Sequence, residues 1–106
     1  MDIQHYQEFI SAFYKKRNWY QYNSFIHPIF FSEEVGEVCR AIRSIEIGRD
    51  RPDEATPDQA EQLENLTEEL GDVLDNLFII ADKYDISLET IMIKHQEKLF
   101  SRYKDA

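Results

Sequence analysis

The sequence is poor in the residues that interrupt helices or cross-link chains, with three glycines, three prolines and one cysteine among 106 residues. A lone cysteine excludes an intramolecular disulfide, and the position of Cys39 opposite Glu37 on a helical wheel indicates a packing role. No apolar run approaches the roughly 18 residues of a membrane-spanning helix. The N-terminus also lacks a signal-peptide pattern. We therefore expect a soluble, cytoplasmic protein without a membrane partner.

Basic residues are also scarce, since 12 Lys and Arg face 21 Asp and Glu for a net charge of −9. A general nucleic-acid partner is not expected, because phosphate contacts need a basic surface. The length predicts one domain over residues 1–106, with a core that is marginal when alone. Burial against a second subunit, and hence a homo-oligomer, is the expectation.

Apolar residues recur at helical rather than alternating spacing along the chain. The pattern predicts an all-α four-helix bundle, with helices over residues 2–17, 25–47, 57–83 and 87–103. The predicted inner stripe of the first helix consists of Ile3, Tyr6, Phe9, Ile10, Phe13 and Tyr14. Ser24, Thr56 and Ser87 are the expected N-caps, because a side-chain oxygen there satisfies a free backbone N–H.

Two acidic pairs carry the chemical signal, Glu34 with Glu37 and Glu69 with Asp72. Each pair is spaced i,i+3, so on a helix both carboxylates share a face. The helical wheel places Glu34, Glu37 and Glu69 on apolar faces and Asp72 at an edge, and no Arg or Lys interrupts those faces beside them. A carboxylate that faces a core is costly unless it is protonated, paired or bound to a cation.

Mg²⁺ is the cation that these oxygen donors favour, with Mn²⁺ as a substitute, because no histidine or cysteine accompanies them as zinc would require. Two Mg²⁺ ions would neutralise four carboxylates and leave positions for water and phosphate oxygens. A site of this kind usually handles phosphates. The alternative is a set of ordinary surface acids at the border of amphipathic helices.

These residues resemble the MazG-like, all-α nucleoside triphosphate pyrophosphohydrolases. The family pattern, Glu-Glu-x-x-Glu on one helix and Glu-x-x-Asp on the next, is matched by residues 33–37 and 69–72, with a glycine at the same point in each. Three flanking segments are similar as well: Lys16–Trp19, Glu68–Leu74 and Glu97–Tyr103. The resemblance covers most of the chain.

The resemblance implies Mg²⁺-dependent cleavage of a (deoxy)nucleoside triphosphate between its α and β phosphates, giving the monophosphate and pyrophosphate, in nucleotide-pool house-cleaning. It makes Glu34, Glu37, Glu69 and Asp72 the metal ligands, with Glu33 as a further member or a support. Glu33 or Glu37 would take the proton of the attacking water. Relatives form homodimers or homotetramers, and the same is expected here.

Substrate binding is assigned to four residues. Lys98 and Arg102 belong to a basic stripe on the last helix and match family positions, although a solvated basic face has the same pattern. Trp19 matches the family and is a candidate for base stacking, with core packing as its alternative. Asn76 lies near the acids on the helical wheel. Rival functions are a non-catalytic helical interaction module, a dUTPase-like enzyme and a phosphoribosyl-ATP pyrophosphatase-like enzyme.

Overall fold

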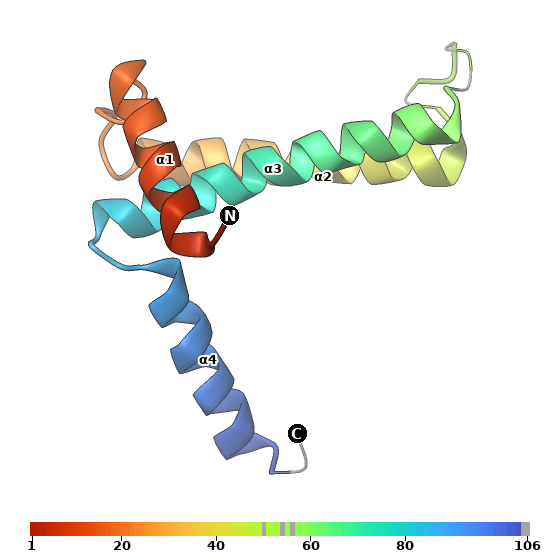
Figure 1. The fold of residues 1–106 in the computed structure, drawn as a ribbon. Helices are drawn as coiled ribbons and strands as arrows, with labels where there is room; N and C mark the ends of the chain where they lie inside the picture. The colour runs from red at the N-terminus through yellow and green to blue at the C-terminus, as the bar shows by residue number, and fades with distance from the viewer. Residues whose placement is uncertain (50, 54, 56, 105–106) are drawn as a thin grey trace. The chain divides into compact units, whose positions relative to one another are not determined.

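The computed structural model describes residues 1–49, 51–53, 55 and 57–104. It contains the helices α1 (Ile3–Lys16), α2 (Ile26–Ile47), α3 (Gln59–Lys83) and α4 (Leu88–Arg102) (Figure 1). No strand occurs among the described residues, and none of their helices combines the length and apolar character needed to cross a membrane. The all-α prediction is confirmed, and each predicted helix end lies within two residues of the observed one.

The helices belong to two compact units. Met1–Ser24 and Phe78–Ala106 form the terminal unit, and Phe25–Leu77 form the hairpin unit. Because α3 continues through Leu77 and Phe78, this helix contributes to both units. Both acidic pairs fall within the hairpin unit, whereas Trp19, Lys98 and Arg102 fall within the terminal unit. A single domain over residues 1–106 stays a prediction.

The core of the terminal unit forms where α1 meets the end of α3 and the start of α4. The buried cluster consists of Ile10, Phe78, Ile79, Ala81 and Leu88. Ile79 has no exposed surface. The predicted stripe of α1 packs here through Ile10, Ile3, Tyr6, Phe13 and Tyr14. Phe9 is the exception at 52% exposure, because it sits at the margin of this face, with its ring 5.8 Å from that of Tyr6.

Gln7 links α1 to the turn between α3 and α4. Its side-chain Nε2 donates to the carbonyl oxygen of Ile86 at 3.0 Å, and its Oε1 accepts from the backbone N–H of Leu88 at 3.2 Å. That N–H belongs to the first turn of α4, where no intrahelical acceptor exists. Gln7 is 5% exposed and Leu88 is 6% exposed, so the bond between them joins polar groups largely withdrawn from water.

Asp82 ties both α1 and the segment after it to the end of α3. Its Oδ2 accepts hydrogen bonds from Ser11 Oγ at 2.9 Å and from the Tyr20 hydroxyl at 2.7 Å. Burial, and then the hydrogen bond to Asp82, raises the pKa of Tyr20 to about 12. Tyr20 therefore remains a protonated donor at neutral pH. Between α1 and Tyr20 the chain reverses through Asn18, whose φ of 63° is left-handed.

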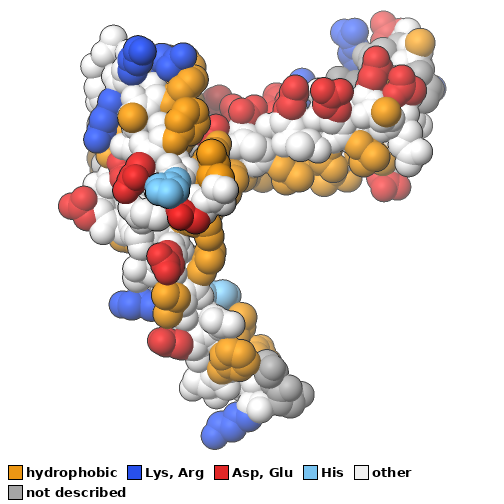
Figure 2. All heavy atoms as spheres, in the orientation of Figure 1, with side chains coloured by type: hydrophobic (Ala, Val, Ile, Leu, Met, Phe, Trp, Pro, Cys, Tyr) orange, Lys and Arg blue, Asp and Glu red, His pale blue; other side chains and the backbone are white. Residues whose placement is uncertain are grey.

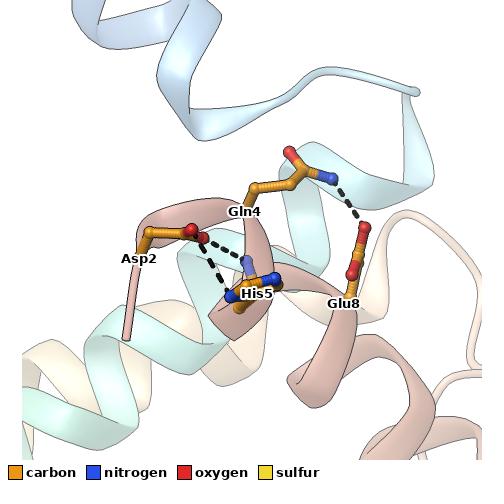
Figure 3. Close-up of polar contacts among 4 residues, drawn as sticks. All are labelled: Asp2, Gln4, His5 and Glu8. Carbon is orange, nitrogen blue, oxygen red and sulfur yellow. Dashed lines mark hydrogen bonds and ion pairs between the residues drawn. The ribbon is translucent and has the colours of Figure 1, made fainter.

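Two helices of the terminal unit begin with side-chain caps. The predicted cap Ser87 is confirmed, since its Oγ accepts from the backbone N–H of Thr90 at 3.1 Å. Asp2 caps α1 by accepting from the backbone N–H of His5 at 2.8 Å (Figure 3). These bonds satisfy donors that a helix start leaves without intrahelical partners.

The other two predicted caps do not have this role. The prediction that Ser24 caps the second helix is wrong, because α2 begins after Phe25 and has no side-chain cap. Thr56 lies outside the described residues. The α3 helix begins at Gln59, and the carboxylate of Asp58 accepts from the backbone N–H of Glu61 at 2.8 Å. An acid close to the helix start thus supplies the acceptor.

The hairpin unit pairs α2 with α3 in antiparallel directions. Gln62 Nε2 donates to the carbonyl oxygen of Ser44 at 2.7 Å, and Glu34 lies beside Asp72, so residue numbers fall along α2 as they rise along α3. Acidic side chains gather along one edge of the hairpin and hydrophobic ones along the opposite edge (Figure 2). Cys39 is exposed, so the packing role predicted for it is wrong within this chain.

Candidate metal centre

The hairpin register brings together three carboxylates, from Glu34 of α2 and from Glu69 and Asp72 of α3. One oxygen of each lies within 4.8 Å of the others. Glu34 and Glu69 are half-buried, and Asp72 is exposed. The i,i+3 spacing accounts for the proximity of Glu69 and Asp72. Glu34 joins them through the pairing of α2 with α3.

The three carboxylates repel one another in a partly dehydrated position. Burial, followed by the negative charges of Asp72 and Glu69, raises the pKa of Glu34 above its ordinary value. Smaller contributions in the same direction come from Glu37 and Glu33. Burial and the charge of Asp72 likewise raise the pKa of Glu69. Every one of these effects disfavours the ionised form.

The donor set fits a hard divalent cation. Three carboxylates supply oxygen ligands, which suit Mg²⁺ and Mn²⁺, and their spacing allows one ion to be shared. A bound cation would also offset the repulsion between the three carboxylates, because its positive charge stabilises their ionised forms. Glu34, Glu69 and Asp72 are therefore the residues that could hold the metal in this geometry.

Glu37 has a partner that the sequence analysis missed. Arg40 Nη1 lies 3.3 Å from Glu37 Oε2, and the Arg40 side chain is 56% exposed, so this basic residue pairs with the acid from the solvent side. The i,i+3 spacing of the two residues is the signal that could have revealed the pair. Arg40 also opposes the rise in the pKa of Glu69. Glu33, the other proposed base, is exposed.

A cavity of about 270 Å³ opens beside the carboxylate cluster. Its lining comes from both helices and the connection between them: Glu37, Arg40, Ala41, Ser44, Pro57, Asn65 and Glu69. A second cavity of about 410 Å³ shares Ser44, Pro57 and Asn65 with the first. Glu69 thus belongs both to the candidate cation site and to the wall of a cavity that a ligand could enter.

The four predicted substrate-binding residues differ in their surroundings. Asn76 is buried, and its Nδ2 donates to the backbone carbonyl of Asp72 at 2.9 Å, one turn away on α3. Trp19 is 46% exposed, with its ring 5.5 Å from that of Tyr14. Lys98 and Arg102 are exposed on α4. The substrate contacts of all four stay predictions.

Comparison with known proteins gives the family. A family model described as the MazG nucleotide pyrophosphohydrolase domain matches residues 29–106, which include both acidic pairs. The chain is 48% identical over 106 residues to the uncharacterized protein YvdC of Bacillus subtilis (strain 168), with all of both chains covered. No solved structure matches the chain significantly. With its carboxylates brought together by α2 and α3, the chain belongs to the MazG nucleotide pyrophosphohydrolase domain family.

Proposed function

We propose that the protein is a cytoplasmic, Mg²⁺-dependent nucleoside triphosphate pyrophosphohydrolase. It cleaves a (deoxy)nucleoside triphosphate between the α and β phosphates, releases the monophosphate and pyrophosphate, and serves nucleotide-pool house-cleaning. The observation that carries the proposal is the cluster of Glu34, Glu69 and Asp72 within a MazG domain. A site made of carboxylates suits a reaction in which a cation offsets phosphate charge.

Each acidic residue has a distinct task in this proposal. Glu34, Glu69 and Asp72 hold the cation, and Glu37 joins them as a ligand or acts as the base. Bound Mg²⁺ supplies charge neutralisation at the phosphates and lowers the pKa of water. Glu37 or Glu33 takes the proton of the attacking water as the bridge between the α and β phosphates breaks. Glu37 is favoured, because it shares a cavity wall with Glu69 whereas Glu33 is exposed.

The test of this function is pyrophosphate release from a panel of nucleoside and deoxynucleoside triphosphates. We expect release with Mg²⁺, none after chelation, and a fall of about 100-fold in Glu37→Gln, as for loss of a general base. Glu46→Gln is the matched control, since Glu46 is an exposed acid on the same helix and should leave turnover unchanged. Mg²⁺ binding without release from any triphosphate would instead indicate a helical interaction module.

We also propose that the active form is a homodimer or homotetramer. The hairpin unit exposes many large apolar side chains: Phe25, Ile29, Phe30, Val35, Ile42, Ile47, Leu63, Leu70, Leu74 and Leu77. A contiguous apolar edge of this kind usually marks an interaction surface. Sedimentation or light scattering should give a mass two or four times 12.7 kDa. A mass of one chain at working concentrations would contradict this proposal.

A further inference from the structure

We propose that Arg40 contacts the phosphate chain of the substrate, and that its guanidinium exchanges Glu37 for phosphate oxygens when the nucleotide binds. The inference deepens the proposed function, on which it rests, by naming the residue that anchors the triphosphate in the cavity beside the carboxylates. Nothing in the acidic motifs themselves assigns this role, because both motifs contain acids alone as charged residues.

The charges around the cavity indicate the need for such a residue. Glu37 and Glu69 both line it and would repel a polyphosphate. Arg40 is the single cationic side chain among the described residues of the lining, and it faces both acids closely enough to pair with one and affect the pKa of the other. Asn65 and Ser44 add neutral donors to the same wall. Phosphate bound here would thus meet a cation and two polar groups.

The resting contact of Arg40 is easily exchanged. A single nitrogen–oxygen approach of 3.3 Å joins it to Glu37, and the two side chains are 56% and 40% exposed. Exposed pairs of this kind contribute little to stability, because water screens them. The guanidinium carries five N–H donors in a planar fork that matches two phosphate oxygens at once. A phosphate would therefore offer Arg40 a better partner than one carboxylate oxygen.

The adjoining cavity is the wrong place for phosphates. Its charged lining among the described residues consists of Glu61, Glu64 and Glu68, with Gln62 and Asn65 as the amides. Like charges disfavour a phosphate chain there, whereas hydroxyl and amino donors of a nucleoside would find acceptors. We therefore expect the phosphates in the first cavity, which Arg40 lines.

A purely electrostatic role for Arg40 makes a different prediction. If Arg40 acted only by offsetting the negative charge at Glu37 and Glu69, removing it would alter Mg²⁺ affinity and leave phosphate affinity at saturating Mg²⁺ unchanged. A direct contact predicts instead that phosphate affinity falls at saturating Mg²⁺, because the lost hydrogen bonds are those to the phosphate. The two roles can therefore be separated by measuring the affinities independently.

The experiment compares Arg40→Gln with Arg43→Gln, which removes the same charge from the same helix at a position outside the cavity lining. Calorimetry at saturating Mg²⁺ measures affinity for inorganic pyrophosphate and for a non-hydrolysable α,β-methylene triphosphate. We expect Arg40→Gln to weaken both by about 10- to 100-fold, as for loss of a charge-assisted bond, and Arg43→Gln to change them less than about twofold. Arg40→Lys, which keeps the charge but loses the fork, should fall between them.

Each outcome decides the inference. Equal affinities in the folded Arg40→Gln and Arg43→Gln proteins would overturn it, as would a change confined to Mg²⁺ affinity. If Arg40→Gln does not fold by circular dichroism, a wild-type affinity in Arg40→Lys would overturn it. If the wild type turns over a triphosphate and Arg40→Gln binds both phosphate ligands with unaltered affinity, the inference is refuted and the proposed function stands. If pyrophosphate binding depends on Arg40 but no triphosphate is turned over, the proposed function is refuted and the inference about Arg40 stands.

Discussion

Glu69→Gln should lower pyrophosphate release by about 1000-fold or more and, in the absence of metal, make the protein more stable. Under the proposed function Glu69 is a direct metal ligand, so its loss should lower the activity by more than the 10- to 100-fold typical of outer-shell partners. The stability rises because the amide removes a half-buried negative charge that lies beside Glu34 and Asp72. Opposite effects on turnover and stability are the expected mark of a strained functional site.

The pH dependence of the metal-free protein follows from the same charges. The pKa values of Glu34 and Glu69 are raised by folding, so the folded state keeps protons that the unfolded state releases. This contribution to stability is fully present below the ordinary glutamate pKa and is lost as the pH rises through the raised values. Thermal melting across acid to neutral pH should show a shallower decline in Glu69→Gln than in the wild type.

Added Mg²⁺ provides the complementary measurement. A ligand that binds the folded state stabilises it, so Mg²⁺ should raise the melting temperature of the wild type at neutral pH and have little effect on Glu69→Gln. Glu46→Gln should behave as the wild type in all three assays. A variant with full turnover, or with an undiminished response to Mg²⁺, would remove Glu69 from the metal site.

Gln7→Ala should destabilise the protein by about 2–3 kcal/mol, because it leaves two polar backbone groups without their partners. Gln7 is buried and bonds both the carbonyl of Ile86 and the N–H of Leu88. The truncation also leaves a small void between α1 and the turn before α4. Denaturant unfolding monitored by circular dichroism gives the change in the free energy of unfolding.

Gln4→Ala is the matched control for this prediction. Gln4 lies one turn earlier on α1 and is exposed, and its Nε2 donates at 3.1 Å to Glu8, which is also exposed (Figure 3). Such a surface bond contributes a few tenths of a kcal/mol, so this variant should remain within about 0.5 kcal/mol of the wild type. Equal effects of the two substitutions would show that the buried contacts of Gln7 contribute nothing of their own.

The sequence by itself determined the helices and the proximity of Glu69 and Asp72 along one of them. Helical periodicity with few glycines and prolines places four helices to within two residues at their ends, because each depends on local spacing. The spacing of Glu69 and Asp72 likewise makes them neighbours on α3 whatever surrounds them. Ser87 was found as a cap for the same reason, since its acceptor and the N–H it serves are three residues apart.

Local spacing also has failures that the structure explains. Ser24 carries a capping side chain, but α2 starts after Phe25, where no side chain caps it. The start of α3 is served by Asp58, whose carboxylate accepts from the backbone N–H of Glu61 and which the sequence analysis did not name as a cap. Cap identity depends on the backbone angle at one residue, and a sequence pattern does not specify that angle.

The tertiary structure decided which residues meet across helices. Glu34 approaches Glu69 and Asp72 because α2 and α3 run antiparallel in a register set by side-chain contacts along the hairpin, such as Gln62 with Ser44. The cavity lined by Arg40 and Asn65 depends on that same register. These contacts join residues far apart in the sequence, and their geometry follows from packing, whereas periodicity specifies only the face of each helix on which a side chain lies.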